Sequence, residues 1–364
     1  MPPAVRRRHA VFHPLAVKAI EPLTDDSVAI TFDVPPELKD EFDFTAGQHL
    51  NIRTAGAGDD TRRSYSICSR AGSGVLRIAV KRLPGGAFSS YAATGLKVGE
   101  VIDVMTPLGR FNTPLDPSHE KHYAFIAAGS GITPVLSLIA TTLEVEPKSR
   151  VTLLYGNRTA GSVMFADELG DLKDRYAERF HLVHVLSRES TEVELFSGRI
   201  DSERLGRMLD TILPLDTVDD WFLCGPYAMV VGAQELLQGR GVERGHIHAE
   251  LFHVGDIPAP RTEEPPPPAE EDAAQVTVVL DGRRTTFPLT EHGKAVLDAT
   301  LSVRSDAPFA CKGGVCGTCR AKLLEGTVRM DTNWALEPDE VRAGYVLTCQ
   351  SHPTSPKVTL DYDA

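Results

Sequence analysis

The stretch C-K-G-G-V-C-G-T-C-R at residues 311–320, followed by L-T-C-Q at residues 347–350, decides the fold of the C-terminal part of the chain. It spaces cysteines as C-x4-C-x2-C with a distant fourth, the pattern of plant-type [2Fe–2S] ligation. Glycine accepts positive φ and lets backbone N–H groups approach sulfur, so Gly313, Gly314 and Gly317 suit such a loop. The predicted cluster ligands are Cys311, Cys316, Cys319 and Cys349.

Zinc and disulfide bonds are the alternatives for these cysteines. Structural zinc sites usually combine two close Cys or Cys/His pairs, not three clustered ligands and a distant fourth. Disulfides persist in secreted proteins, and the basic start at residues 6–8 is not followed by the sustained apolar region of an export signal. We therefore expect iron–sulfur ligation in a cytoplasmic protein.

Length and charge narrow the function further. A chain of 364 residues is long enough for two or three domains. It contains no apolar run approaching the roughly 18 residues that span a bilayer, so no membrane span is expected. The net charge of −12 argues against nucleic acid as the main partner, because nucleic-acid-binding surfaces are basic.

A segment rich in proline and glutamate at residues 255–275 predicts an extended linker, which makes residues 276–364 a separate domain. In this domain V-T-V-V-L-D-G-R-R-T-T-F-P-L predicts two strands joined at Asp281-Gly282. A helix is expected over about residues 294–303, before the cysteine loop. A last strand is expected over residues 358–362.

The two regions before the linker differ in their hydrophobic pattern. Residues 10–118 contain short strand-like segments between Gly/Pro turns, which predicts an antiparallel β-barrel. Residues 119–254 contain the apolar strands Y-A-F-I-A-A, V-T-L-L-Y-G, H-L-V-H-V-L and W-F-L-C-G, with helical stretches such as residues 164–176 between them. This alternation predicts an α/β domain with a doubly wound parallel sheet.

A glycine-rich turn, A-A-G-S-G-I-T-P, follows the first of these apolar strands. Gly129 and Gly131 would let a pyrophosphate approach backbone N–H groups at a helix N-terminus. Thr133 would cap that helix, and Pro134 would lie in its first turn. Pro134 stands where the third glycine of G-x-G-x-x-G would be, so a plain strand–helix turn is the alternative. Its place after the first strand favours a dinucleotide site.

Further dinucleotide candidates follow the later strands: Arg158 in Y-G-N-R, Ser187 and Arg188 in L-S-R-E, and Arg199 in S-G-R-I. Each arginine alone would be an ordinary surface charge. An arginine near the adenosine ribose accommodates a 2′-phosphate, so jointly they favour NADPH over NADH. Cys224-Gly225-Pro226 ends the fourth strand, where the thiol either faces the nicotinamide or is simply packed.

Two motifs in the barrel region suit a flavin. Arg63-Ser64-Tyr65-Ser66 offers a guanidinium for a phosphate, a ring to stack on a flat ring system and a hydroxyl for a ring nitrogen. Gly85-Gly86-Ala87-Phe88-Ser89 offers small residues and a hydroxyl for a diphosphate. Barrel packing of Tyr65 and a hairpin turn at the two glycines are the alternatives.

The motifs R-S-Y-S, G-G-x-x-S, G-S-G-I-T-P, S-R-E, G-R-I and C-G-P occur in the order found in the ferredoxin–NADP reductase superfamily, which the chain resembles from about residue 10, apart from the linker. With its C-terminal plant-type ferredoxin module, which implies a β-grasp α+β fold, the chain resembles the reductase components of multicomponent oxygenases. Residues 311–326 and 334–353 most resemble the reductase subunits of phenylacetyl-CoA epoxidases.

The resemblance implies roles for individual residues. Arg63, Tyr65, Ser66 and Ser89 would contact the flavin, and Phe252, in A-E-L-F after the last sheet strand, would shield the flavin ring. Ser66 and Cys224 would shape the surroundings of the reacting flavin and nicotinamide, with no general acid or base. The segments G-G-x-x-S and P-L-G-R-F favour FAD over FMN.

The implied activity is that of an NADPH-dependent reductase. NADPH gives up two electrons as hydride whereas a [2Fe–2S] cluster accepts one, and FAD bridges this mismatch. Electrons would pass from NADPH through FAD and the cluster to a di-iron oxygenase component acting on phenylacetyl-CoA. The alternatives are the same electron chain serving a steroid or aromatic-ring hydroxylase or a desaturase, and a non-catalytic iron–sulfur sensor.

Overall fold

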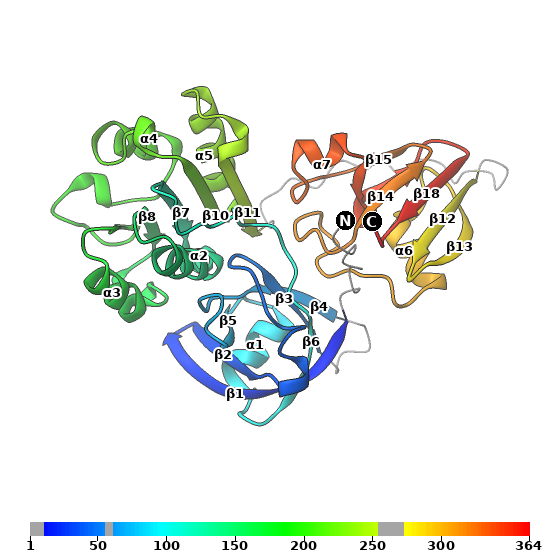
Figure 1. Ribbon diagram of the computed structural model, residues 1–364, viewed down its shortest axis with the longest axis horizontal. Coiled ribbons are helices and arrows are strands. Elements are labelled where there is room, and N and C mark those ends of the chain that lie inside the picture. Colours follow the sequence, from blue (N-terminus) through cyan, green and yellow to red (C-terminus); the bar gives the residue numbers. More distant parts are fainter. Residues whose placement is uncertain (1–10, 55–60, 254–272) are drawn as a thin grey trace. The chain divides into compact units, whose positions relative to one another are not determined.

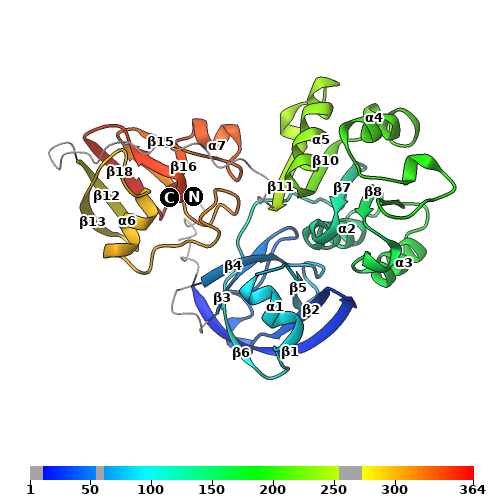
Figure 2. The ribbon, with the colours of Figure 1, turned by 180° about the vertical axis from the view of Figure 1, so that it is seen from behind.

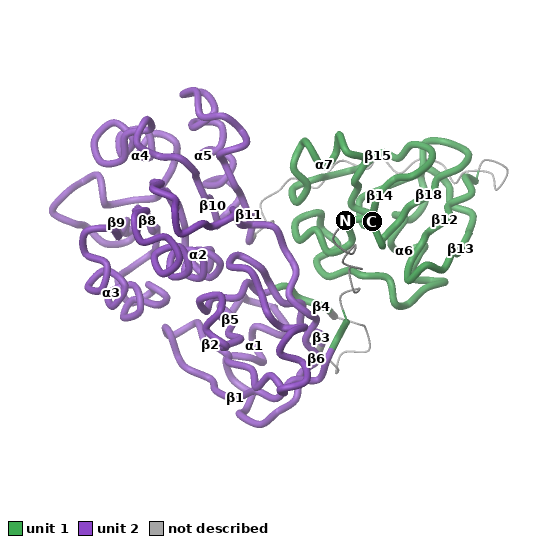
Figure 3. The backbone as a smooth tube through the Cα atoms, in the orientation of Figure 1, with its two compact units in different colours: residues 1–12, 55–64, 257–364 green, residues 13–54, 65–256 purple. Residues whose placement is uncertain are grey.

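A computed structural model describes residues 11–54, 61–253 and 273–364 of the chain. The chain divides into two compact units (Figure 3): residues 1–12, 55–64 and 257–364 form unit 1, and residues 13–54 and 65–256 form unit 2. In the part of the chain that the structure describes, each hydrophobic cluster draws its residues from one unit only.

The N-terminal half of unit 2 contains most of the predicted antiparallel sheet, with strand order β4-β3-β6-β1-β2-β5; residues 12 and 61–64 of this sheet are assigned to unit 1. An isolated bridge joins Ile67, just after β4, to Ile78 on β5, so the two edges of the sheet meet as in a barrel. Helix α1 (Ala87–Thr94) buries Phe88 and Ala92 in the core of this sheet. The strands are β1 (Phe12–Thr24), β2 (Ser27–Asp33), β3 (His49–Thr54), β4 (Thr61–Ser66), β5 (Leu76–Lys81) and β6 (Val101–Met105).

The second half of unit 2, called the nucleotide lobe below, spans residues 122–253 and is a parallel sheet with the order β11-β10-β7-β8-β9. Its strands are β7 (His122–Ala128), β8 (Arg150–Asn157), β9 (Phe180–Leu186), β10 (Asp220–Pro226) and β11 (Ile247–His253). Its α-helices are α2 (Ile132–Val145), α3 (Ala166–Arg175), α4 (Ser202–Thr211) and α5 (Tyr227–Gly239).

Helices cover both faces of the parallel sheet (Figures 1 and 2). Along β7, Tyr123, Phe125 and Ala127 pack with α2 and α3. The alternate residues Ala124 and Ile126 pack with α4 and α5. A strand covered on both faces has no solvent side, which explains why these strands are almost continuously apolar. The prediction of a doubly wound sheet is confirmed.

The barrel and the nucleotide lobe share part of one hydrophobic core. Cys68, Ala79 and Phe111 of the barrel belong to the same cluster as Phe125 and Val135 of the lobe. This continuity explains why the two predicted domains form a single compact unit.

Unit 1 contains the C-terminal α+β domain. Its main sheet has the order β13-β12-β18-β14-β16, and β15 pairs separately with β17. Val296 and Leu297 of α6 pack on this sheet. The elements are β12 (Ala274–Leu280), β13 (Arg283–Leu289), α6 (Val296–Val303), β14 (Arg320–Glu325), β15 (Val328–Met330), α7 (Pro338–Arg342), β16 (Tyr345–Leu347), β17 (Ser351–Pro353) and β18 (Lys357–Asp361).

The C-terminal domain follows its predicted pattern, with shifted boundaries. Asp281 and Gly282 join β12 and β13 with φ values of 53° and 68°, as a tight type I′ hairpin requires. Helix α6 begins two residues later than expected, at Val296. Most of the predicted linker lies outside the described residues, and β12 already begins at Ala274.

Among the described residues, no helix combines the length and apolar character needed to cross a membrane.

Candidate functional site

The predicted dinucleotide turn lies between β7 and α2. Gly129 has a φ of 55°, and a Cβ added there would meet no atom within 4 Å, so open space adjoins its backbone. Gly131 is required by packing, because a Cβ there would lie 2.2 Å from the carbonyl oxygen of Cys224. One glycine therefore leaves room for a ligand, and the other brings β10 against the turn.

The expected cap by Thr133 was wrong. The chain passes through a 3-10 turn, η2 (Gly129–Gly131), and α2 begins at Ile132 with Gly131 as its N-cap. Thr133 lies inside the first helical turn, where its Oγ1 donates to the Ser130 carbonyl at 3.0 Å. Pro134 lies in the first turn, as predicted. Among the described residues, no side chain caps this N-terminus, which suits an anion.

The predicted arginines lie in the loops that follow β8 and β9. The N–H of Arg188 donates to the carbonyl of Arg158 at 2.8 Å, and the N–H of Ser187 donates to that of Asn157 at 2.9 Å. These bonds hold the two strand ends side by side. The side chains of Arg158, Arg188 and Arg199 are all exposed, so their guanidinium groups are accessible to a ligand, although the second loop also carries the exposed carboxylates of Glu189, Glu192 and Glu194.

Cys224-Gly225-Pro226 ends β10 against the glycine turn. A Cβ added to Gly225, whose φ is 155°, would lie 2.8 Å from Met229 Cε and 3.2 Å from the Ala128 nitrogen. Cys224 is fully buried in the core shared with the barrel. Burial, with the nearby Glu250 carboxylate, raises the pKa of its thiol. The thiol is therefore neutral and tightly packed, and its contact with a nicotinamide stays a prediction.

Strand β11 was not predicted, and it carries a half-buried acid, Glu250, whose Oε2 atom is buried. Glu250 pairs in register with Cys224, and burial raises the pKa of its carboxyl to about 8. Its Oε2 has no hydrogen-bond partner within the described part of the chain. The run I-H-A-E-L alternates apolar and polar residues, which is the signal of a half-covered strand, and β11 does lie at the edge of the sheet; the prediction overlooked this signal.

Phe252 lies inside β11, not after the last strand as expected. The expectation failed because β11 itself was missed. The Phe252 side chain is half-buried and packs against the hydrophobic cluster that contains Cys224.

The predicted flavin residues Arg63 to Ser66 lie on β4. Arg63 is exposed, Ser64 and Tyr65 are half-buried, and Ser66 is buried. The Tyr65 ring packs against Phe88 with 5.3 Å between ring centroids and a tilt of 47°. Barrel packing therefore orients Tyr65 and leaves part of the ring accessible for stacking.

The second flavin motif forms the turn before α1. Gly85 has a φ of 76°, and Gly86 is the N-cap of the helix. The Ser89 hydroxyl accepts from the Leu83 N–H at 3.2 Å and donates to the Gly86 carbonyl at 3.3 Å. A Cβ at Gly86 would lie 2.4 Å from that hydroxyl oxygen. Ser89 thus closes the turn, and the exposed glycine supplies the open backbone.

The cysteine loop has the tight backbone that its glycines predict. Gly314 and Gly317 have φ values of 76° and 67°. Gly313 does not adopt a positive φ, and Lys312 does so in its place, at 53°. The loop is closed by the Trp334 N–H, which donates to the Gly314 carbonyl at 3.0 Å.

The four cysteines interact as two thiol pairs, Cys311 with Cys316 and Cys319 with Cys349. Interaction with the Cys316 side chain, with help from the Gly313 and Val315 amides, lowers the pKa of Cys311 to about 6 despite burial, and the same interaction raises the pKa of Cys316. Interaction with the Cys319 side chain likewise lowers the pKa of Cys349, and it raises the pKa of Cys319. Thiolates are the form that binds iron. Two thiol pairs that are electrostatically coupled to each other, with the Gly313 amide donating to Cys311 Sγ at 3.3 Å, fit the ligands of a [2Fe–2S] cluster.

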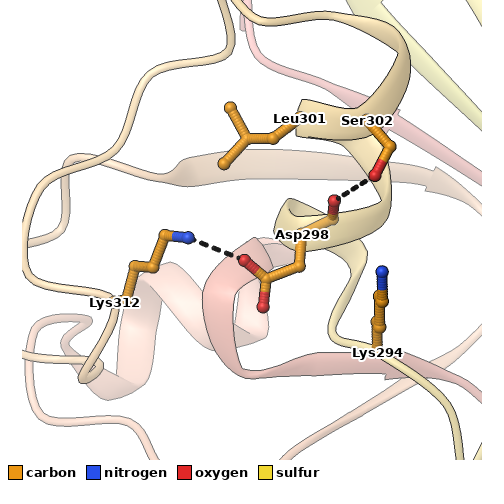
Figure 4. Close-up of a pocket in the computed structure, with 5 residues that line it drawn as sticks. All are labelled: Lys294, Asp298, Leu301, Ser302 and Lys312. Carbon is orange, nitrogen blue, oxygen red and sulfur yellow. Dashed lines mark hydrogen bonds and ion pairs between the residues drawn. The ribbon is translucent and has the colours of Figure 1, made fainter. Parts of the chain in front are cut away.

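A shallow hollow of about 400 Å³ adjoins the cysteine loop (Figure 4). Lys312 Nζ reaches Asp298 Oδ1 on α6 at 2.8 Å and lies 4.9 Å from the centroid of the Phe309 ring. Ion pairing to α6 thus supports the strained residue of the loop. The lining residues are Lys294, Asp298, Leu301, Ser302 and Lys312.

Each of the three domains matches a different protein family. Residues 14–113 match the oxidoreductase FAD-binding domain, and residues 125–235 match the oxidoreductase NAD-binding domain. Residues 278–354 match the 2Fe–2S iron-sulfur cluster binding domain. The molecule is an oxidoreductase with FAD-binding, nicotinamide-nucleotide-binding and [2Fe–2S] domains, and the residues described above fit these groups.

Two relatives match almost the whole chain. One of the subunits of 1,2-phenylacetyl-CoA epoxidase from Escherichia coli (strain K12) is 43% identical, covering 97% of this chain and 98% of its own. The ferredoxin reductase component of 3-ketosteroid-9-alpha-monooxygenase from Rhodococcus rhodochrous is 32% identical, covering 96% of each chain. The chain belongs to this family of ferredoxin–NADP reductase-like proteins with a C-terminal ferredoxin domain.

Solved structures show the same fold at lower identity. Phthalate dioxygenase reductase matches with a TM-score of 0.58 and 22% identity, covering 96% of this chain and 98% of its own. An intact type IV self-sufficient cytochrome P450 monooxygenase matches with a TM-score of 0.68 and 23% identity, covering 96% of this chain and 41% of its own.

Proposed function

We propose that this protein is the NADPH-dependent reductase component of a di-iron oxygenase that acts on phenylacetyl-CoA. The observation that carries the proposal is the 43% identity to the phenylacetyl-CoA epoxidase polypeptide of Escherichia coli over 97% of the chain. When bound, FAD and the cluster convert a two-electron hydride donor into a source of single electrons. A cytoplasmic location belongs to the same proposal.

The proposed domains are the FAD-binding barrel at residues 10–118, the NAD(P)-binding domain at 119–254, the linker at 255–275 and the ferredoxin domain at 276–364. The three family matches support this division, since each falls inside one of these ranges.

The proposed flavin site uses β4 and the turn before α1. Arg63 would neutralise a phosphate, Tyr65 would stack on the ring system, and Ser64 and Ser66 would offer hydroxyls. The exposed backbone at Gly85 and Gly86, held by Ser89, would receive the diphosphate. Phe252 is proposed to cover the flavin ring until the nicotinamide displaces it.

The proposed NADPH site lies at the carboxyl edge of the parallel sheet. Gly129, with the uncapped helix N-terminus before Thr133 and Pro134, would receive the pyrophosphate, and Gly131 would keep Cys224-Gly225-Pro226 close to the nicotinamide. The preference for NADPH over NADH is supported by the accessible guanidinium groups of Arg158, Arg188 and Arg199 on two adjacent loops, with Ser187 beside them.

A steroid hydroxylase is the second candidate partner, and the 32% identity to the ketosteroid monooxygenase reductase favours it specifically. The electron route within this chain would be the same in either case. The two candidates differ only in the surface that the cysteine loop meets.

Reconstitution tests the proposal. With NADPH, the protein should drive epoxidation by a phenylacetyl-CoA oxygenase and leave a ketosteroid oxygenase unsupported, and NADH should give a lower kcat/KM. Turnover of the steroid oxygenase alone would overturn the choice of partner.

Cys316→Ser should abolish cytochrome c reduction and leave flavin reduction intact, whereas Cys68→Ser, at a buried cysteine outside the loop, should keep both. Parental cytochrome c reduction by Cys316→Ser would refute the route.

A further inference from the structure

Arg77 and Glu168 form an ion pair across the junction of the barrel and the nucleotide lobe, inside unit 2. Arg77 lies on β5, and Glu168 lies in the first turn of α3. The guanidinium donates to both carboxylate oxygens, at 3.1 Å from Nη1 to Oε2 and 2.5 Å from Nη2 to Oε1. The Arg77 side chain is 15% exposed and the Glu168 side chain is 40% exposed. A bidentate, partly buried pair fixes geometry as well as charge, unlike most surface pairs.

The same junction holds a strained residue. Phe165, which is buried, has a φ of 61°, a left-handed conformation that bulky residues rarely adopt. Its carbonyl accepts from the Leu169 N–H at the start of α3, and the Arg77 guanidinium carbon lies 5.2 Å from its ring centroid. Such strain persists only where the surroundings hold it, and Arg77 is one of the groups that do so.

The ion pair connects the two proposed cofactor sites. On the barrel side, Arg77 precedes Ile78, which is bridged to Ile67, the residue after Ser66. On the lobe side, Glu168 lies on the helix that follows β8 and Arg158. Both elements belong to the same compact unit (Figure 3). Neither member of the pair is among the proposed cofactor contacts.

Neutral hydrogen bonds already hold the other side of the junction. The Ser137 hydroxyl of α2 donates to the Ser69 carbonyl at 2.6 Å, and the Ala71 N–H donates to Thr141 Oγ1 at 3.1 Å. These bonds fasten α2 to the loop between β4 and β5. The Arg77–Glu168 pair makes the corresponding charged connection to α3.

We propose that the Arg77–Glu168 pair is a positioning clamp that sets the nicotinamide against the flavin for hydride transfer. The inference rests on the proposed route from NADPH to FAD and is independent of the oxygenase. Hydride transfer needs the reacting atoms in near-attack geometry, and a displacement of about 1 Å can cost about 100-fold in rate. A loosened α3 would change that geometry without removing any cofactor contact.

The test is rapid-mixing reduction of the flavin by NADPH in the full-length, FAD-loaded protein without an acceptor. Glu168→Gln keeps the shape of the side chain and removes its charge. Arg77→Lys keeps the charge but cannot donate two parallel hydrogen bonds to the carboxylate. Both should slow flavin reduction by about tenfold. FAD content and reduction by dithionite should be unchanged. Amide hydrogen exchange at residues 165–169 should become faster in both variants.

Glu21→Gln is the matched control. Glu21 Oε2 lies 3.7 Å from Arg77 Nη2, but Glu21 belongs to the barrel itself, and its side chain is 59% exposed. This variant should reduce its flavin at the parental rate. Flavin reduction by NADPH at the parental rate in Glu168→Gln would overturn the proposed clamp. Equal slowing of this step in Glu21→Gln would also overturn it, and so would slower reduction of the Glu168→Gln or Arg77→Lys flavin by dithionite. Failure of the proposed route is distinguishable, because the parental protein would then not reduce its flavin with NADPH.

Discussion

Glu250 makes the stability of the nucleotide lobe depend on pH. Burial raises the pKa of its carboxyl from 4.5 to about 8. Between these two values the folded state holds a proton that the unfolded chain has lost, so this group's contribution to stability falls as pH rises from about 4.5 to about 8. Glu250→Gln carries no titrating group and should remove that fall. Urea unfolding at several pH values, with FAD in excess, measures the difference between the variants.

The control for Glu250 is Glu192→Gln, which removes an exposed carboxylate from the same lobe. It should leave the pH dependence of unfolding unchanged. An identical slope for Glu250→Gln and the parental protein would contradict the assignment, because the buried carboxyl would then titrate alike in both states.

Single residues were predictable where local chemistry alone fixes their role. Asp281-Gly282 is an example, since a two-residue hairpin demands positive φ at both positions. Gly131 and Thr133 were not predictable in full. The close approach of Cys224 to Gly131 and the 3-10 turn that displaces Thr133 from the cap both depend on packing between elements far apart in sequence.

Two glycines in the barrel have nearly the same φ but different surroundings, so comparing them distinguishes the cost of backbone strain from the cost of a steric clash. Gly47 has a φ of 87° and Gly99 one of 88°. A Cβ at Gly47 would lie 1.8 Å from the Phe111 carbonyl oxygen, whereas one at Gly99 would meet nothing within 4 Å. Gly99→Ala should cost about 1–2 kcal/mol. Gly47→Ala should cost at least about 3 kcal/mol, because the backbone must also move.

Denaturant unfolding of the two alanine variants measures this difference in the free energy of unfolding. Equal destabilisation of the two variants would mean that the close approach of the Phe111 carbonyl oxygen does not exclude a side chain at position 47.

Elements were predictable when their hydrophobic period was clean. The apolar runs predicted β7, β8, β9 and β10, and the alternation of strands and helices predicted the parallel sheet. Strand β11 was missed because only continuously apolar runs were taken as strands of the parallel sheet, whereas this edge strand alternates apolar and polar residues in I-H-A-E-L. Its pairing with β10 depends on tertiary packing. Because β11 was missed, Phe252 was predicted to follow the last strand when it lies inside that strand.

At the scale of the whole molecule, the order of the three domains followed from composition and motifs, but the sharing of one core by two of them did not. The core of the ferredoxin domain is drawn only from residues 276–362 among the described residues. The barrel and the lobe instead pack through Cys68, Ala79 and Phe111. Contacts between domains leave no periodic signal in a sequence, which is why the clamp between Arg77 and Glu168 was not predicted.

These separate cores predict that the chain can be cut between residues 253 and 273 into two folding proteins. Residues 1–253 should bind FAD and reduce ferricyanide with NADPH, because the clusters of unit 2 lie between residues 15 and 252. Residues 273–364 should unfold cooperatively and show iron–sulfur absorption, because their core and all four cysteines are retained.

The separated pair should transfer electrons in proportion to its concentration. A covalent connection typically keeps two modules at an effective concentration in the millimolar range. Mixed at about 1 µM, the fragments should therefore reduce cytochrome c at least about 100-fold more slowly than the intact chain. The rate should rise linearly with the concentration of the ferredoxin fragment, and a fragment carrying Cys316→Ser should give no increase. A rate in the dilute mixture equal to that of the intact chain would show that the connection adds nothing to electron transfer, because docking alone would then hold the two parts together.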